Sequence, residues 1–273
     1  MPRILDYTGQ DAERTVTVAD VAAAGDRDQP LVQVTAGTAD EAAAAEEAGI
    51  EMVVCLGDAV PAVRLGSSKV FVTAAIDFGG AITEDDILAA AFDALVAGAD
   101  AVITARGLSS VERLTHEDIP TMGHLGFVPK KSNLLGGVRA VGKTADEAVR
   151  LLDDFRRLEE AGAFAVECEL IPARVMSIIR QRTGMTTISL GSGGDADVIF
   201  LFMNDLCGES PRKPRHARAY ADLSSLHEQV RRERVRALEA FRADATSGAF
   251  PSTAEEAGIS DDELAALVAR LED

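Results

Sequence analysis

The chain alternates short apolar runs with longer amphipathic segments, and this alternation constrains its fold more than any other feature. Glycines such as Gly49, Gly98 and Gly162 follow several of the amphipathic segments, as expected where helices end. Strands that alternate with helices are typical of a parallel sheet in which helices connect the strands. Because eight strand candidates favour a closed barrel over an open sheet, the sequence predicts an α/β fold, a (β/α)8 TIM-type barrel.

The predicted elements have the following bounds. Strands are expected at residues 31–34, 51–56, 70–75, 101–104, 121–123, 164–169, 186–190 and 198–203. Helices are expected at residues 39–48, 84–97, 145–161, 174–183 and 217–245.

The length of 273 residues suits one large domain or two small ones, and a barrel of this class needs about 250 residues. We therefore expect residues 1–273 to form a single barrel domain, with the polar segment 1–28 as an N-terminal cap. Hydrophobic residues make up 47% of the chain and aromatic residues only 4%, so the core is expected to consist mainly of Ala, Val, Leu and Ile.

An extra C-terminal helix is expected over residues 260–272. Ser260 followed by Glu263 has the spacing of a capping box, which marks the start of a helix. The apolar residues that follow share one face of that helix, which we expect to pack on the barrel or on a neighbouring subunit; they are Leu264, Leu267, Val268 and Leu271.

Charge and cysteine content exclude several classes of protein. The net charge of −18 would repel nucleic-acid phosphates, so a nucleic-acid partner is not expected. Cys55, Cys168 and Cys207 are far apart and form neither a disulfide framework nor a zinc-binding spacing, which suits a reducing cytoplasm. A polar N-terminus predicts no signal peptide, and no apolar run is long enough for a membrane helix.

Residues 137–144 read GVRAVGKT and fit the phosphate-loop pattern GxxxxGK[ST]. In a nucleotide hydrolase, a buried strand directly precedes the first glycine of that pattern. Here the preceding residues, 130–135, read KKSNLL and are expected to form a loop. We therefore expect no nucleotide site, and we interpret Lys143 as a residue at the start of a helix near the barrel mouth.

A histidine lies between glycines in residues 123–129, which read GHLGFVP. Glycines lack a Cβ and let the backbone approach a ligand closely, although a surface loop with a solvated histidine would show the same spacing. This segment, together with Asn133 and Gly136-Gly137, resembles the signature loop of the ketopantoate hydroxymethyltransferase family. That family adds a one-carbon unit to a 2-oxo acid in pantothenate biosynthesis.

Further segments carry the same resemblance, which covers roughly residues 31–252 and is strongest from Gly123 onward. They are residues 161–172 (AGAFAVECELIP), 190–193 (LGSG), Asp197, 204–208 (NDLCG), Tyr220 and 248–251 (GAFP). The resemblance implies a barrel of the phosphoenolpyruvate mutase and isocitrate lyase superfamily, and a ring-like homo-oligomer.

The resemblance also implies roles for residues at the ends of the predicted strands. His124 and Glu169 correspond to catalytic residues of the family, the glutamate handling the proton at C3 of the substrate. Asp58 corresponds to a ligand of the Mg2+ ion, and with Gly57 it would also contact the substrate. Asp77 corresponds to the second aspartate of the metal-binding pattern in the wider superfamily. The implied co-substrate is 5,10-methylenetetrahydrofolate.

The chain departs from the family pattern at four positions around this expected site. Ala59 stands where the family has a serine that contacts the substrate carboxylate, and Ala75 stands where it has a metal-ligand aspartate. Ile103 and Ala105 replace a lysine and a metal-site glutamate. The loss of two carboxylates should weaken Mg2+ binding, while Arg106 could replace the lost lysine as a two-pronged carboxylate clamp.

Structural interpretations of these residues remain open. Asp58 could cap a helix, Asp77 could stabilise a turn, Glu169 could form a salt bridge at a strand end, and Cys168 could be a small core residue. Three functions are compatible with the sequence. The first is hydroxymethyl transfer to 3-methyl-2-oxobutanoate, giving 2-dehydropantoate. The others are carbon–carbon lyase or aldol-type chemistry on another 2-oxo acid, and a non-catalytic paralogue with a degraded metal site.

Overall fold

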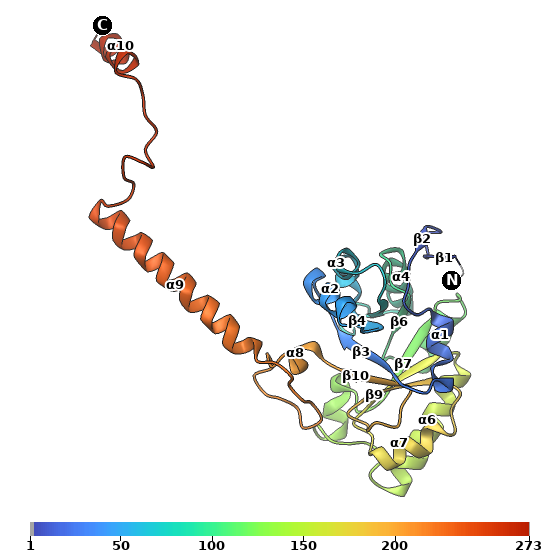
Figure 1. The fold of residues 1–273 in the computed structure, drawn as a ribbon. Helices are drawn as coiled ribbons and strands as arrows, with labels where there is room; N and C mark the ends of the chain where they lie inside the picture. Colours follow the sequence, from blue (N-terminus) through green and yellow to red (C-terminus); the bar gives the residue numbers. More distant parts are fainter. Residues whose placement is uncertain (1–2, 273) are drawn as a thin grey trace. The chain divides into compact units, whose positions relative to one another are not determined.

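A computed structural model describes residues 3–272, and its centre is a closed barrel of eight parallel strands (Figure 1). This confirms the (β/α)8 prediction. The strands follow one another around the barrel in sequence order, and the last closes onto the first. They are β3 (Leu31–Thr35), β4 (Met52–Leu56), β5 (Phe71–Ala75), β6 (Ala101–Ile103), β7 (Thr121–Gly126), β8 (Ala165–Glu169), β9 (Thr186–Leu190) and β10 (Val198–Leu201).

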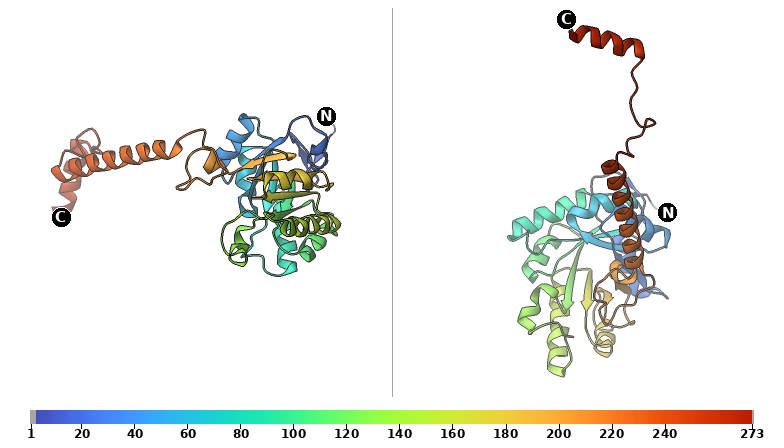
Figure 2. Two further views of the ribbon diagram at one scale, coloured as in Figure 1. Left: turned by 90° about the horizontal axis from the view of Figure 1, so that it is seen from below. Right: turned by 90° about the vertical axis from the view of Figure 1, so that its left-hand side faces the viewer.

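Helices connect most of the consecutive strands and lie outside the barrel (Figure 2). They are α2 (Ala39–Glu47), α3 (Val60–Gly66), α4 (Glu84–Val96), α5 (Leu108–Thr115), α6 (Ala145–Glu160) and α7 (Ala173–Arg180). Their N-caps explain several of the bounds, because Thr38, Thr83 and Thr144 each accept a bond from the third backbone N–H of the following helix. The short helices α3 and α5 were not predicted, since one or two turns give little periodicity.

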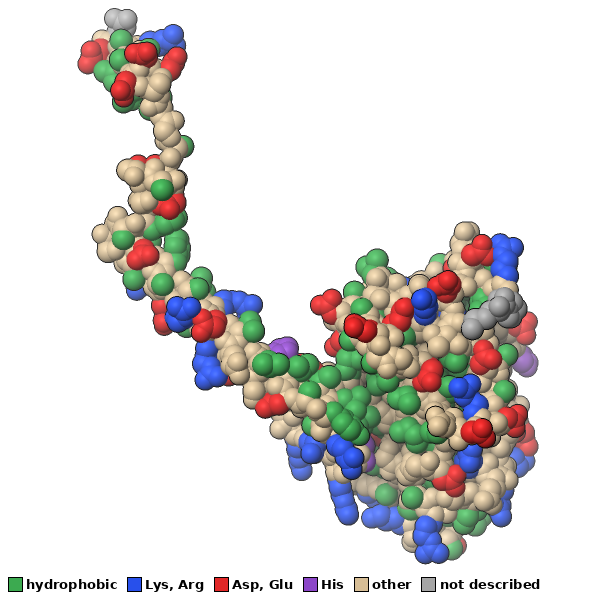
Figure 3. Space-filling model, viewed as in Figure 1, with side chains coloured by type: hydrophobic (Ala, Val, Ile, Leu, Met, Phe, Trp, Pro, Cys, Tyr) green, Lys and Arg blue, Asp and Glu red, His purple; other side chains and the backbone are tan. Residues whose placement is uncertain are grey.

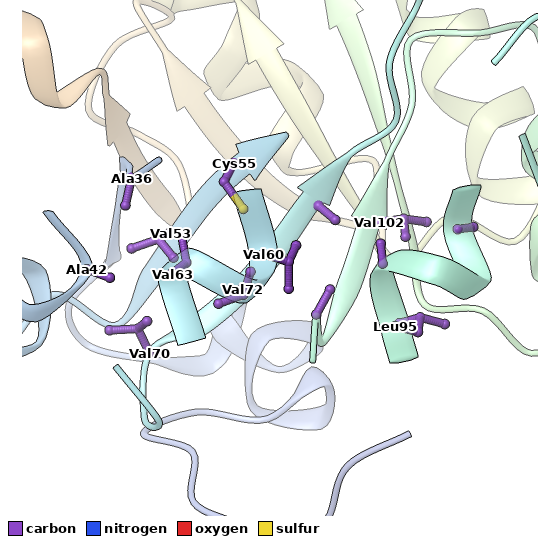
Figure 4. Packing of buried hydrophobic residues seen from close by; sticks show 14 of the residues in the cluster. Ala36, Ala42, Val53, Cys55, Val60, Val63, Val70, Val72, Leu95 and Val102 are labelled. Atoms are coloured by element: carbon purple, nitrogen blue, oxygen red, sulfur yellow. The ribbon is translucent and has the colours of Figure 1, made fainter. Parts of the chain in front are cut away.

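The packing between strands and helices relies on small side chains. Figure 4 shows alanine and valine side chains filling the space between β4, β5 and the helices that cover them, with Val53, Val63 and Val72 at its centre. The prediction of an aromatic-poor core is thus confirmed in this cluster. At one end of the barrel, Val16 and Val21 of the N-terminal segment pack with inward-facing strand residues.

That N-terminal segment consists of short elements. They are β1 (Ile4–Leu5), β2 (Asp11–Ala12), α1 (Val18–Ala22) and the 3-10 helix η1 (Ala24–Asp26). A half-buried aspartate fastens the segment to the barrel. Asp100 lies directly before β6, and its carboxylate contacts Arg14 Nε and Arg64 Nη2, each at 2.6 Å. The same carboxylate accepts a bond from Val72 N at 2.8 Å, so it joins the N-terminal segment, α3 and β5.

The chain separates into two compact units, residues 1–220 and residues 221–273. The second unit contains α9 (Leu223–Ser247) and α10 (Asp261–Glu272), and no described residue of either helix is buried. Figure 3 shows hydrophobic side chains between charged ones along α9. Helix α9 begins six residues later than the predicted helix, whereas α10 begins directly after Ser260, whose Oγ accepts a bond from Glu263 N at 3.4 Å. No described helix is long and apolar enough to cross a membrane.

Candidate functional site

The histidine of the glycine-rich segment lies inside the barrel beside two carboxylates. His124 belongs to β7, and in the register with β8 it lies opposite Glu167, while Gly126 lies opposite Glu169. Residues two apart on a strand point to the same side, so all three polar side chains face inward. The Nε2 atom of His124 lies 3.1 Å from Glu169 Oε2, and its Nδ1 atom lies 3.8 Å from Glu167 Oε2.

Gly126 makes room for this arrangement. Its φ is +86°, and a Cβ at this position would lie 2.3 Å from the backbone oxygen of Glu169. The next residue, Phe127, donates its N–H to that same oxygen at 2.8 Å. The glycine was expected to let the backbone approach a ligand, but at residue 126 the backbone approaches the strand that carries Glu169. His124 itself was expected at a strand end and instead lies within β7, which runs three residues beyond its predicted end.

Glu167 is a polar residue of the site that the sequence reasoning missed. Its Oε1 atom accepts a bond from Nε2 of Gln33, at 3.2 Å, and both side chains are buried. Gln33 belongs to β3, so the two meet across the barrel interior. The signal in the sequence was an acidic residue at every second position of an apolar strand, which places both carboxylates on the inner face.

Burial and neighbouring charges shift the pKa values of His124 and Glu167. Burial alone would lower the pKa of His124, but the bond to Glu169 and the charges of Glu167 and Glu169 outweigh it and raise the pKa above its usual value. Burial raises the pKa of Glu167, and the nearby His124 offsets only part of this rise. His124 and Glu167 therefore hold their protons more tightly than the isolated side chains would.

A cavity of about 580 Å3 opens above this cluster at the C-terminal ends of the strands. His124 and Glu167 line it together with apolar and aromatic side chains, whereas Glu169 is bonded to His124 and is not itself among the lining residues. Lys130, in the 3-10 helix η3 (Pro129–Leu135), supplies the basic side chain among the described lining residues. This size and this mixture of apolar walls with a few polar groups are typical of a small-molecule site.

The structure places Asp58 and Asp77 in a different cavity. With Gly57 they line a space of about 510 Å3 whose remaining wall comes mostly from alanines of β5 and α4. The two cavities adjoin and share Leu56, Ala75 and Ile76 as lining residues. The expected constellation is therefore divided, with the histidine and glutamates on one side and the two aspartates on the other.

The local contacts of the aspartates bear on the structural interpretations that the sequence left open. Asp77 Oδ1 accepts a bond from Gly79 N at 3.0 Å and thus stabilises the turn after β5. Asp58 lies within the 3-10 helix η2 (Gly57–Ala59), after its N-cap residue, so it does not cap a helix. Within residues 3–272, no group of three or more His, Cys, Asp or Glu side chains is arranged to hold a metal ion.

Arg106 is engaged with the backbone of a neighbouring loop. Its Nη2 atom donates to the carbonyl oxygens of Phe78 and Ala81, and its guanidinium lies 4.5 Å from the centre of the Phe78 ring. These contacts hold the loop between β5 and α4. The Nη2 atom of Arg106 is thus used by this loop, and its role as a clamp for a substrate carboxylate stays a prediction.

The phosphate-loop-like segment lies in a loop, as predicted, because β7 ends at Gly126 and η3 separates it from residues 137–144. The carboxylate of Glu147 accepts bonds from the backbone N–H groups of Gly142 and Lys143, at 3.2 and 3.1 Å. Arg139 pairs with the same carboxylate at 2.9 Å. The backbone N–H groups that would bind a phosphate in a nucleotide hydrolase thus bind a carboxylate of the same chain.

Neither buried cysteine has the environment of a nucleophile. Cys168 points outward from β8 and is fully buried, and this burial raises the pKa of its thiol. Cys55 lines the 580 Å3 cavity, but burial raises the pKa of its thiol to about 11.

Comparison with known proteins identifies the relatives of this chain. A family model described as ketopantoate hydroxymethyltransferase matches residues 59–253. The 3-methyl-2-oxobutanoate hydroxymethyltransferase of Thermobifida fusca is 35% identical, with 89% of this chain and 94% of the relative covered. The protein of that name from Ignicoccus hospitalis is 31% identical, with 87% and 97% covered.

Solved structures share the fold at low sequence identity. Phosphonopyruvate hydrolase in complex with oxalate and Mg2+ superimposes with a TM-score of 0.51 and 12% identity, covering 94% of this chain and 100% of the other. Phosphoenolpyruvate phosphomutase from Streptomyces platensis gives a TM-score of 0.50 and 14% identity, with 94% and 96% covered. Both comparisons agree with the barrel described above.

Proposed function

We infer that this chain, which belongs to the ketopantoate hydroxymethyltransferase family, transfers a hydroxymethyl group to 3-methyl-2-oxobutanoate, giving 2-dehydropantoate. The observation that carries the proposal is the His124–Glu169 pair beside a cavity large enough for a small 2-oxo acid and a one-carbon donor. The donor that the family name implies is 5,10-methylenetetrahydrofolate.

The chemistry requires a proton to leave C3 of the substrate and an enolate to form. A buried carboxylate with a histidine partner can accept that proton, and we assign this step to Glu169. His124, held between two carboxylates, can carry positive charge and stabilise the enolate oxygen. Water adds to the one-carbon unit and tetrahydrofolate leaves, so that the unit is released as formaldehyde. The enolate carbon then bonds to the formaldehyde carbon, and the resulting alkoxide takes up a proton to become the hydroxyl group.

The residues present do not fit the Mg2+ site expected for the family. Asp58 and Asp77 line the adjoining cavity, Asp77 is used in a turn, and Ala75 and Ala105 bring no oxygen ligand. Two carboxylates with water as the remaining ligands would bind Mg2+ weakly, because ligand charge sets the affinity of such sites. We therefore assign no step of the reaction to a metal ion.

Proton exchange at C3 tests the assignment without the folate donor. In D2O, the protein should replace the C3 proton of 3-methyl-2-oxobutanoate with deuterium, as followed by proton NMR. Glu169→Gln should slow the exchange by about 100-fold or more, the usual contribution of a general base. Glu159→Gln, which removes a carboxylate on the outside of the barrel, is the matched control and should leave the rate unchanged. Equal rates for the two variants would contradict the role of Glu169.

The second candidate function is carbon–carbon lyase or aldol-type chemistry on another 2-oxo acid. The altered residues Ala59, Ala75, Ile103 and Ala105 favour it, because they change the environment of the substrate carboxylate and the metal. Deuterium exchange with other 2-oxo acids, but not with 3-methyl-2-oxobutanoate, would support this alternative. A protein that exchanges none of them would be a non-catalytic paralogue.

We also propose that the chain forms a homo-oligomer. Apolar side chains on α9 and α10 are exposed, among them Leu238, Phe241 and Leu267. A mass of one 28.7 kDa chain in light scattering, at both low and high salt, would contradict the proposal. Both salt conditions are needed because the acidic surfaces repel one another at low ionic strength.

A further inference from the structure

Glu167 has contacts that the proposed reaction does not yet use. It lines the 580 Å3 cavity together with His124, and its two oxygens have different neighbours. Oε1 accepts the bond from Gln33, at 3.2 Å, and Oε2 faces the Nδ1 atom of His124 at 3.8 Å. The carboxylate is thus oriented by an amide on one side and directed toward the histidine on the other.

The position of Gln33 requires an explanation. Its side chain is only 1% exposed, and its Oε1 atom has no hydrogen-bond partner among the residues that the structure describes. Burying an amide with one unpaired atom costs free energy, so the presence of this residue in the barrel interior calls for an explanation. The contact that it makes is the bond to Glu167, so we interpret Gln33 as the residue that fixes the position of this carboxylate.

The two ring nitrogens of His124 face one carboxylate each. A neutral imidazole has one N–H donor and one acceptor nitrogen. If both neighbouring carboxylates are ionised, the one that faces the acceptor nitrogen repels it. An imidazolium carries an N–H on both nitrogens, so it can donate to Glu169 at 3.1 Å and also places its positive charge beside Glu167 at 3.8 Å. Glu167 and Glu169 on β8 are the charged groups that act on the ring across the strands, and Lys130 of η3 lines the same cavity.

We propose that Glu167, oriented by Gln33, is a positioning residue that holds His124 with its charged ring toward the cavity, where it receives an anionic 2-oxo acid. The identity of the substrate rests on the proposed function, but the placement of the ring does not. With an alanine in place of the expected serine and an isoleucine in place of the expected lysine, the imidazolium and Lys130 supply the positive charge of the cavity.

The test is an NMR titration of His124 in the full chain labelled with 15N histidine. In the unmodified protein, the pKa of His124 should lie above its ordinary value. Glu167→Gln keeps the shape of the side chain but removes its charge, and it should lower the pKa of His124 by about one unit or more. Glu41→Gln is the matched control, because Glu41 also lines the cavity and its carboxylate accepts bonds from the backbone N–H groups of residues 37 and 38. This control should change the pKa of His124 by less than about 0.3 units.

Equal effects of Glu167→Gln and Glu41→Gln would overturn the inference. If Glu167→Gln does not fold, as judged by far-UV circular dichroism, Glu167→Asp replaces it. The shorter side chain withdraws the carboxylate from the ring and should lower the pKa of His124 by a smaller amount, whereas an unchanged pKa would overturn the inference.

The titration separates this inference from the proposed function. A shifted His124 pKa in a protein without turnover would support the positioning role and contradict the transferase. Turnover with an unshifted His124 pKa would support the transferase and contradict the positioning role. In an active protein, Glu167→Gln should raise the KM for the 2-oxo acid about tenfold and change kcat less, because it weakens the binding of the anion.

Discussion

Replacing Gly126 by alanine should destabilise the barrel more than the same change at Gly136 or Gly194. Two effects add at this position. An alanine at φ +86° adopts the left-handed region, which costs about 1–2 kcal/mol. Its Cβ would also lie 2.3 Å from the backbone oxygen of Glu169 and 2.8 Å from Ile171 Cγ1, and overpacking of this kind costs about 1–3 kcal/mol. We expect a total of about 2–5 kcal/mol.

Two control glycines separate the effects. Gly136 has a φ of +74° and nothing within 4 Å of an added Cβ, so Gly136→Ala should cost only the backbone contribution, about 1–2 kcal/mol. Gly194 also has open space and lies outside the left-handed region, so Gly194→Ala should change stability by less than about 1 kcal/mol. Urea unfolding followed by far-UV circular dichroism measures all three, since the chain has no tryptophan.

The close approach of β7 to β8 at Gly126 also has a functional consequence. The backbone that the new Cβ meets carries Glu169, so Gly126→Ala should slow deuterium exchange at C3 even in the folded variant. A Gly126→Ala protein no less stable than Gly136→Ala would refute the reasoning, because the close approach of β7 to β8 would then have no energetic cost.

Three further predictions concern charged groups. The double substitution Ala75→Asp with Ala105→Glu should tighten Mg2+ binding by about tenfold or more in calorimetry, because it adds two carboxylates; equal affinities would mean that other ligands hold the ion. Asp100→Ala should destabilise the barrel by about 3 kcal/mol in urea unfolding, because it leaves two partly buried arginines without their shared partner; a loss below about 1 kcal/mol would contradict this. The raised pKa of His124 favours folding fully below about pH 6.5 and less as pH rises through the raised value, so the free energy of unfolding should fall as the pH rises above about 6.5. His124→Gln should remove this slope, and a slope that persists would assign it to another group.

The sequence predicted the barrel well because its signals are local. Seven of the eight strands have apolar runs whose predicted ends lie within two residues of the observed ones, and the exception is the strand that carries His124. That strand was predicted to end at Gly123, the first glycine of the glycine-rich segment. In the structure Gly123 lies within β7, and an added Cβ would be 2.3 Å from Leu158 Cδ2, so its small size serves the packing of α6.

The site was harder to predict because it depends on contacts between distant strands. The pairing of His124 with Glu169 agrees with the resemblance to the family, but Gln33 and Glu167 are 134 residues apart and meet only across the closed barrel. The two aspartates were difficult to place for a different reason. Asp58 and Asp77 both follow strand ends and were expected at one mouth, but strand ends do not determine which cavity a side chain enters. Their side chains line the space beside α4 instead.

The most direct test of the account is the complete reaction. The purified protein, given 3-methyl-2-oxobutanoate and 5,10-methylenetetrahydrofolate, should form 2-dehydropantoate and tetrahydrofolate in equal amounts, as measured by mass spectrometry. His124→Gln should reduce the rate by about 100-fold or more, because it removes the charge beside the enolate oxygen. Formation of no product by the unmodified protein, at several Mg2+ concentrations including zero, would contradict the assignment of hydroxymethyl transfer to this chain.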